Sequence, residues 1–204
     1  YSDGSRAERP VTWSQADVSH SGIVTVKGEA DGRQVEARVE VLAVERELPV
    51  IKRVAPGTDL SSVDKSIPLA LTDGSVEHYD VDKWEIAPEE QAKLSVAGSR
   101  IPMTGHLAGD TISATLLVEE GEAAGPVTPL VTVGGEAVSD LTSQKPVHYQ
   151  SLAYGAQLPS VAATAENADV TVVQASASNG MRANIYVQPK DGGALQTYAV
   201  QFLE

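Results

Sequence analysis

The sequence predicts an all-β protein made of small β-sandwich modules in tandem. Apolar and polar residues alternate with a period of two over most of the chain, and no helical stripe is sustained. One hairpin pattern also occurs twice. Hydrophobic residues make up 42% of the 204 residues but aromatic residues only 4%, which suits thin two-sheet modules with cores of Val, Ala and Leu.

The first predicted element is a hairpin in "GIVTVKGEADGRQVEARVEVLAV", residues 22–44. Val24 and Val26 alternate with polar residues before an Asp31-Gly32 turn, a dipeptide that favours two-residue hairpins. The return strand continues the alternation with Val35, Ala37, Val39 and Val41. Two antiparallel strands are expected.

The same hairpin recurs in "IPMTGHLAGDTISATLLVEE", 77 residues later. The matching pairs are Gly28 and Gly105, Gly32 and Gly109, and Val35 and Ile112. Upstream, Asp3-Gly4-Ser5 matches Asp73-Gly74-Ser75 at an offset of 70, and Trp13 matches Trp84 at an offset of 71. The offset grows where "APEEQAKL" is longer than "SQADVSH", as expected of a surface loop.

The second copy has about two strands of sequence, residues 48–71, before its Asp-Gly-Ser turn, and the first copy has none. We therefore expect the first module to lack its opening strands and the chain to be a piece of a longer array. Its apolar face, formed by Val24, Val26, Val35 and Val39, is expected to be incompletely covered. A neighbouring chain, strand exchange or a preceding segment of the parent would fill it.

A third unit follows a Gly- and Pro-containing linker. The expected domains are a partial module at 1–45, a complete module at 46–120, a linker at 121–128 and a small C-terminal β-sandwich at 129–204. The last unit ends in a hairpin about Asp191-Gly192-Gly193. Its inward residues are expected to be Ile185, Val187, Tyr198, Val200 and Phe202.

The Asp-Gly-Ser turn, the strand ending in Trp, "VTVKGEADG" and the Val-rich closing strand resemble bacterial immunoglobulin-like modules of group 4. The resemblance covers residues 1–45 and 46–120, with "IPMTG" in place of the commoner valine-rich strand. The third unit is similar to small C-terminal β-modules of large secreted bacterial glycoside hydrolases, including multimodular β-galactosidases of Gram-positive bacteria. The resemblance implies tandem immunoglobulin-like β-sandwiches, the first truncated at its N-terminus, in a secreted or cell-wall-associated bacterial protein.

Charge and composition exclude several classes of partner. Fifteen Lys and Arg against 28 Asp and Glu leave a formal charge of -13, which repels nucleic acid and anionic lipid surfaces. No apolar stretch approaches 18 residues, so membrane insertion is not expected. The absence of cysteine excludes disulfides, thiolate metal sites and thiol nucleophiles.

No catalytic, cofactor-binding or metal-ligating residue is predicted, and no cofactor. Glycosidase carboxylates need a cleft that holds them about 5 to 9 Å apart, which a thin β-module does not readily supply. No serine lies in a Gly-x-Ser-x-Gly elbow, and no glycine-rich loop joins a strand to a helix. The chain itself is therefore not expected to be an enzyme.

Aromatic residues are the candidate sugar contacts. Trp13 and Trp84 could stack on sugars, but their equivalence in two copies favours a role as core residues of their sandwiches. Tyr149 and Tyr154 lie near His148, and their odd separation places the two rings on opposite faces of a regular strand.

Metal binding has weak candidates. His20, His78, His106 and His148 show no ligand spacing. Asp80 and Asp82 would share one face of a strand and could contribute to a calcium site, although Asp-Gly pairs are better explained by turns.

Three functional hypotheses remain. The leading one is a non-catalytic accessory or spacer region of a secreted multimodular glycoside hydrolase, whose partners are the other modules of the parent polypeptide. The second is a carbohydrate-binding or cell-surface adhesin module, with glycans as partners. The third is that the chain itself hydrolyses a glycoside.

Overall fold

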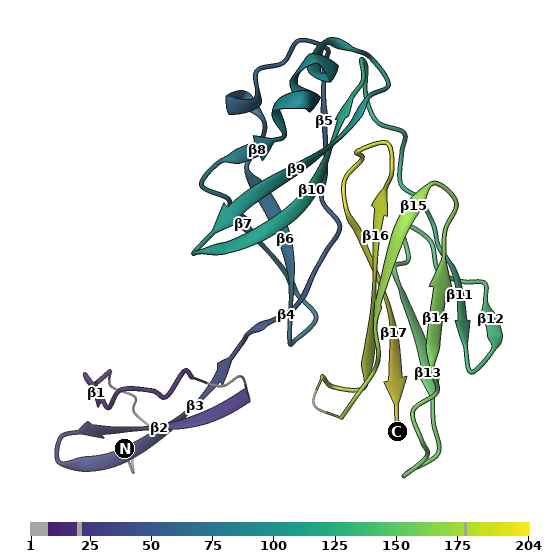
Figure 1. Cartoon of the computed structure of the whole chain (residues 1–204). Coiled ribbons are helices and arrows are strands. Elements are labelled where there is room, and N and C mark those ends of the chain that lie inside the picture. The colour runs from purple at the N-terminus through teal and green to yellow at the C-terminus, as the bar shows by residue number, and fades with distance from the viewer. Residues whose placement is uncertain (1–7, 20–21, 178) are drawn as a thin grey trace. The chain divides into compact units, whose positions relative to one another are not determined.

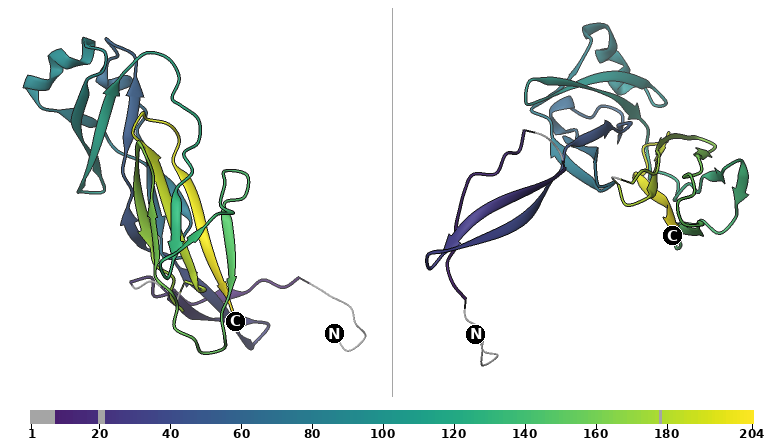
Figure 2. Two further views of the ribbon diagram at one scale, coloured as in Figure 1. Left: turned by 90° about the vertical axis from the view of Figure 1, so that its right-hand side faces the viewer. Right: turned by 90° about the horizontal axis from the view of Figure 1, so that it is seen from below.

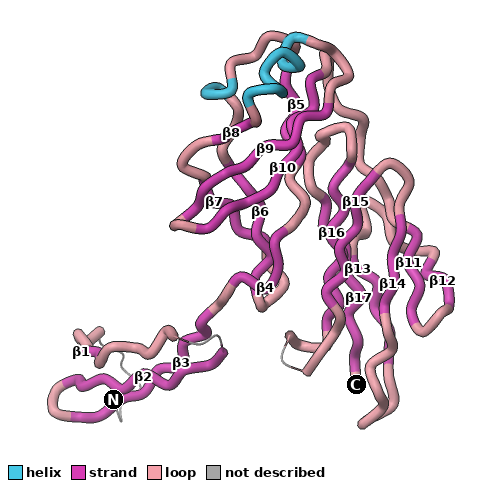
Figure 3. The backbone as a smooth tube through the Cα atoms, in the orientation of Figure 1, coloured by secondary structure: helices cyan, strands magenta, loops and turns pink. Residues whose placement is uncertain are grey.

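The computed structural model describes residues 8–19, 22–177 and 179–204, which lie in two compact units, residues 1–44 and 45–204 (Figure 1). Strands dominate both units, and the prediction of an all-β sandwich fold is confirmed (Figure 3). The helical segments of the described residues are two 3-10 turns, η1 (Leu60–Ser62) and η2 (Pro88–Ser95). The segment "APEEQAKL", expected to be a loop, is thus mostly helical, because Pro88 presets the backbone for a first turn.

Unit 1 is one antiparallel sheet in the order β1 (Thr12–Trp13), β2 (Gly22–Ala30), β3 (Arg33–Val41). Asp31 and Gly32 turn the hairpin with φ of 49° and 74°, as a two-residue turn of this hand requires. Val24 pairs with Val39 across the strands, as the alternation predicted. The right-hand view of Figure 2 shows the twist of this hairpin, in purple.

Residues 45–120 form a two-sheet sandwich. One sheet has the order β5 (Ile51–Val54), β10 (Asp110–Val118), β9 (Arg100–Leu107), β8 (Trp84–Ile86), and the other the order β4 (Val44–Glu47), β6 (Ser66–Leu71), β7 (Val76–Asp80). Strand β5 pairs with β10 in parallel, whereas the pairs β9–β10, β8–β9 and β6–β7 are antiparallel. The core residues between the sheets include Ile67, Trp84, Ile101, Met103 and Leu116.

The internal repeat is visible in strand register. Trp13 pairs with Gly28 in unit 1, and Trp84 pairs with Gly105 in the second module. A Cβ added to Gly28 would lie 2.6 Å from Trp13 Cε3, and one added to Gly105 would lie 2.7 Å from Trp84 Cζ3. Each glycine therefore makes room for an indole ring on the neighbouring strand. Strands β1, β2 and β3 thus correspond to β8, β9 and β10.

Residues 129–204 form a second sandwich. Its sheets have the orders β12 (Glu136–Val138), β11 (Leu130–Val133), β14 (Val161–Thr164) and β13 (Val147–Ser151), β17 (Gln196–Leu203), β16 (Arg182–Pro189), β15 (Ala168–Val173). The five predicted core residues, from Ile185 to Phe202, all belong to its buried cluster. The hairpin β16–β17 turns at Asp191-Gly192-Gly193, as predicted.

Candidate functional site

Trp84 is a core residue, as predicted. Its side chain is buried, and its indole Nε1–H donates to the carbonyl oxygen of Asp64 at 3.0 Å. A buried indole needs such an acceptor, because an unpaired N–H in a low-dielectric core is costly. This ring is therefore closed to a sugar ligand.

Trp13 differs from its repeat partner, and its predicted core role is not met. The residue is 46% exposed, whereas Trp84 is 5% exposed. One face of its ring lies over Gly28, but the described residues of unit 1 include no second sheet to cover the rest. The indole instead lines an open groove of about 660 Å³.

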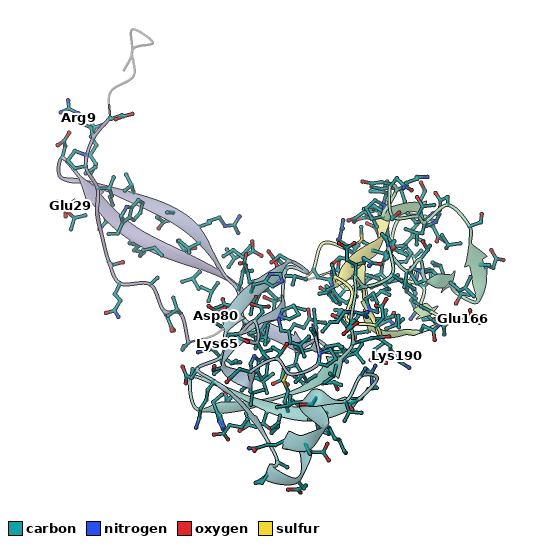
Figure 4. The ribbon with its side chains drawn as sticks, turned by 90° about the horizontal axis from the view of Figure 1, so that it is seen from above. Arg9, Glu29, Lys65, Asp80, Glu166 and Lys190 are labelled. Atoms are coloured by element: carbon teal, nitrogen blue, oxygen red, sulfur yellow. The ribbon has the colours of Figure 1, made fainter. Side chains whose placement is uncertain are left out.

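Polar groups surround this groove. Lys27, Glu29, Asp31 and Gln34 contribute to its walls, and Arg9 Nε lies 3.5 Å from Asp31 Oδ2. Figure 4 labels Arg9 and Glu29 near the tip of the hairpin. A flat indole flanked by hydrogen-bonding side chains is compatible with a sugar ring, and equally with a covering strand.

Tyr149 and Tyr154 of the C-terminal sandwich are exposed but not arranged as the strand argument predicted. Tyr149 lies on β13 and is 61% exposed, while Tyr154 is 94% exposed. Strand β13 ends at Ser151, so Tyr154 lies in a turn and the odd separation says nothing about opposite faces. The parity prediction was therefore wrong in its premise.

His148 contacts a carboxylate close by. Its Nδ1 lies 2.7 Å from Asp140 Oδ1, and Asp140 also pairs with Lys145 at 2.5 Å. The Lys145 ammonium, followed by the His148 ring, holds the pKa of Asp140 below its usual range. This cluster ties the β12–β13 connection to β13.

The imagined calcium site is not assembled on one strand. Strand β7 ends at Asp80, which pairs with Ser66; Figure 4 labels Asp80 and the neighbouring Lys65. Asp82 lies beyond the strand, and its N–H donates to His106 O at 2.8 Å. The prediction that the two carboxylates share a strand face was wrong, because the strand is shorter than the pattern suggested. Among the described residues, no group of three or more His, Cys, Asp or Glu is placed to hold a metal ion.

The other histidines have separate surroundings. His106 Nε2 lies 3.3 Å from Glu85 Oε2, and His78 is on β7. Lys83, followed by His106, lowers the pKa of Glu85. His20 and the Asp3-Gly4-Ser5 turn lie outside the described residues.

Sequence reasoning missed the most densely bonded polar group, the Arg53 guanidinium at the junction of the two sandwiches in residues 45–204. Its Nη1–H donates to Asp191 O at 2.8 Å, its Nη2–H to Glu120 O at 2.8 Å and its Nε–H to Gly121 O at 3.2 Å. Nη1 also lies 3.1 Å from a carboxylate oxygen of Glu119. We call this set of contacts the Arg53 clamp.

The linker after β10 is bonded to the C-terminal sandwich rather than free. The Ala124 N–H donates to Asp191 Oδ2 at 2.6 Å, and the Val127 N–H donates to Gln196 Oε1 at 2.7 Å. The Tyr198 hydroxyl donates to Val127 O at 3.0 Å. A side chain at Gly192 would lie 2.8 Å from Arg53 Cβ, so this turn packs directly under the clamp.

The Asp73-Gly74-Ser75 turn makes a second contact across the same junction. The Tyr186 hydroxyl of β16 donates to Gly74 O at 3.0 Å. Gly74 has a φ of 82°, and a Cβ there would lie 2.0 Å from Asn184 Nδ2, so a larger residue would be strained and would displace the Asn184 side chain. Asp73 Oδ1 accepts from Ser75 Oγ and Ser75 N, which shapes the turn and lowers the pKa of Asp73.

Apolar burial accompanies these bonds. Leu48, Ala70, Val173 and Tyr186 form one buried cluster that joins the two sandwiches. Burial raises the pKa of Tyr186 to about 12, so its hydroxyl stays protonated and can donate. No local sequence signal identifies Arg53 or Tyr186, because each one's bonding partner is far away in the chain.

A polar cleft of about 440 Å³ lies beside the clamp, lined by residues that include Lys52, His78, Gln188 and Gly193. Lys52 Nζ is already committed to Asp64 and to the carbonyl oxygen of Ser66. Gln188 Nε2–H likewise donates to Gly193 O at 2.8 Å. The Lys52 ammonium and the Gln188 amide are therefore already bonded to groups of the chain itself.

Comparison with solved structures shows only loose likeness. A protocadherin γB4 extracellular domain is 12% identical with a TM-score of 0.23, and the match covers 90% of this chain but about 40% of the protocadherin chain. The I9–I11 tandem of titin is 12% identical with a TM-score of 0.16, covering 98% of this chain and 90% of that one. Neither score supports an argument about function.

Comparison of the sequence with family models gives a more specific result than comparison with solved structures. A search of curated proteins, in contrast, found no match. None of the helices in the described residues is long and apolar enough to cross a membrane. Residues 1–33 match the family model for the bacterial Ig-like domain of group 4, which supports an immunoglobulin-like module at this position.

Proposed function

We propose that this chain is a non-catalytic accessory region that spaces the modules of a larger secreted or cell-wall-associated bacterial polypeptide. The proposed parent is a glycoside hydrolase, such as a β-galactosidase. The partners of the chain are then the neighbouring modules of that polypeptide. The Ig-like match at residues 1–33 supports the modular, accessory character of the chain.

The Arg53 clamp is the observation that carries the proposal. A spacer has to keep its modules at a defined separation, and a flexible junction cannot do this. Arg53 donates to backbone carbonyls of the linker and of the C-terminal sandwich, and its side chain is only 15% exposed. Its planar guanidinium satisfies these acceptors together, in a geometry that lysine cannot reproduce.

Loss of the clamp should loosen the junction without unfolding either sandwich. Each sandwich has its own buried core, so Arg53→Ala removes inter-module bonds but little core packing. We expect the distance between the two sandwiches to become broadly distributed in Arg53→Ala. Arg53→Lys should show a distance distribution of intermediate width, because an ammonium keeps the positive charge but lacks the planar, forked arrangement of donors.

The test measures that distance with spin labels. The chain contains no cysteine, so Glu89→Cys on η2 and Glu136→Cys on β12 can be labelled selectively. Arg33→Ala, an exposed arginine of the unit 1 hairpin, is the matched control and should leave the distance unchanged. A distribution in Arg53→Ala as narrow as in the unsubstituted chain would remove the support for a rigid spacer.

A carbohydrate-binding or adhesin role is the second candidate, favoured by the exposed Trp13 in its polar groove and by the exposed Tyr149 and Tyr154. Titration with soluble oligosaccharides tests it through Trp fluorescence, because Trp84 is buried. A saturable change that disappears in Trp13→Ala would favour the binding role. Sugar binding measured by calorimetry that persists in Trp13→Ala but disappears in Tyr149→Ala would place the sugar on the C-terminal sandwich.

A further inference from the structure

Equivalent residues of the two Ig-like repeats differ in burial. Several residues of the second module are more deeply buried than their counterparts in unit 1, although Val26 is buried like its counterpart Met103. Leu116 and Ile101 are 0% exposed, whereas Val39 is 40% exposed and Val24 is half-buried. The tryptophans show the same contrast, with 5% exposure for Trp84 and 46% for Trp13. The face of the β1–β2–β3 sheet that carries Trp13 and Val39 is therefore built as a core surface.

The second module shows what covers this face. Val50, Val63, Ile67 and Leu69, all from the segment 48–71, pack against the equivalent residues. The same segment supplies β5, which pairs in parallel with β10 from Thr115 to Val118. The Thr115 N–H donates to Val50 O at 2.9 Å, and the Glu119 N–H donates to Val54 O at 2.8 Å.

At the repeat offset of 77, the edge of β10 that pairs with β5 corresponds to the outer edge of β3 in unit 1. Thr115 to Val118 correspond to Arg38 to Val41, and the donor amides correspond to those of Arg38 and Leu42. Among the described residues, β3 has β2 as its one partner, so the edge that β5 occupies in the second module carries no described strand. An open edge next to an uncovered apolar face favours strand addition.

The second module also indicates the character of the added strand. There one segment, residues 48–71, supplies both the strand that pairs with β10 and the apolar side chains that cover the face. The occupant of unit 1 is therefore expected to be an extended segment with the same apolar pattern. A second copy fits less well, because its own β5 is already paired with β10 and releasing it would open that module's core.

We propose that unit 1 binds an extended apolar segment that adds parallel to β3 at residues 38–41 and covers Trp13 and Val39. The segment is the counterpart of residues 48–70 of the second module. It places apolar side chains under the sheet and accepts hydrogen bonds from the Arg38 and Leu42 amides. This inference does not depend on the accessory function, because it follows from strand register and burial.

The experiment fuses a copy of residues 48–70 ahead of Tyr1 in the full chain. Acrylamide quenching then reports on Trp13, because Trp84 is buried in both proteins. We expect the quenching constant to fall several-fold in the fusion. Hydrogen exchange should slow at the amides of Arg38 and Leu42, and it should remain fast there in the unfused chain.

Engineered cysteines test the register. Lys52 pairs with Leu116 in the second module, so a cysteine at the copied Lys52 position should form a disulfide with Val39→Cys. Val41→Cys is the matched control, since it lies on the same face but two residues, about 6–7 Å, out of register. The copied cysteine should link to Val39→Cys at least several times faster than to Val41→Cys.

Two results would overturn the proposal. One is a fusion in which Trp13 remains as accessible as before and the two cysteine pairs link equally or not at all. The other is an unfused chain that sediments as a dimer with its Arg38 and Leu42 amides already protected, because a second copy would then be the natural occupant. A monomeric unfused chain with fast exchange at both amides supports the proposal.

Discussion

Gly105→Ala and Gly28→Ala are the same substitution at equivalent positions of the repeat, and we expect different costs. A Cβ at Gly105 would lie 2.7 Å from both Trp84 Cζ3 and Val81 Cγ1. A Cβ at Gly28 would lie 2.6 Å from Trp13 Cε3 and 2.7 Å from Val11 Cγ1. The steric clash is therefore similar at the two positions. The expected difference in stability depends on whether the neighbouring tryptophan can move away from the added Cβ.

Trp84 cannot move away, because its ring is buried and its N–H is bonded to Asp64 O. Overpacking of a tight core costs about 1–3 kcal/mol, from which the lower chain entropy of Ala in the unfolded state recovers about 0.4–1 kcal/mol. The net loss for Gly105→Ala should be about 1–2 kcal/mol. Trp13 is half-exposed and can swing outward, so Gly28→Ala should change stability by less than about 0.5 kcal/mol.

Urea unfolding followed by circular dichroism and Trp emission measures both values. Gly125→Ala is the control, because an added Cβ there has no atom within 4 Å. It should remain within about 0.5 kcal/mol of the unsubstituted chain. A Gly105→Ala protein as stable as the control would refute the argument that glycine is required beneath a fixed indole. Equal, large losses at both glycines would instead show that Trp13 is held as firmly as Trp84.

Three further predictions concern Tyr186 and the absence of catalysis. Tyr186→Phe leaves Gly74 O without its partner, so the protein should lose about 1–3 kcal/mol in urea unfolding; a loss below about 0.5 kcal/mol would contradict the junction contact. Because the pKa of Tyr186 is raised to about 12 in the folded state, its contribution is complete below pH 10. The free energy of unfolding should then fall by up to about 2–3 kcal/mol as the pH rises from 10 toward 12, more steeply than in Tyr186→Phe. Parallel pH profiles of the two proteins would count against this prediction. The purified chain should not hydrolyse chromogenic β-galactosides, and turnover that disappears when one carboxylate is replaced would favour the enzymatic hypothesis.

Local patterns were sufficient to predict the hairpins. In "VTVKGEADGRQVEARV" the alternation and the Asp31-Gly32 turn act within a few residues, and the structure pairs Val24 with Val39 accordingly. The repeat alignment matched Gly105 with Gly28 and Trp84 with Trp13, and the structure shows that each tryptophan pairs with its glycine. The core of the last hairpin, Ile185 with Tyr198, also followed from alternation alone.

Strand ends were less predictable. The separation of Tyr149 and Tyr154 in the sequence carried no information about strand faces, because β13 ends at Ser151. In the same way, Asp82 lies beyond the end of β7, the strand that contains Asp80. An alternating pattern can continue past the last ladder hydrogen bond. Where the pairing stops depends on the neighbouring strand, which lies elsewhere in the sequence.

The sequence by itself determined the all-β class, the repeat and its turns, because period-two patterning and Asp-Gly chemistry are local properties. The sequence predicted a core role for both tryptophans, and only the tertiary structure showed that Trp13 is half-exposed, since burial of an indole requires a second sheet. The same holds for Arg53, which donates to Asp191 O, 138 residues away in the chain. Such contacts depend on how modules pack, and no short stretch of residues encodes the partner's position.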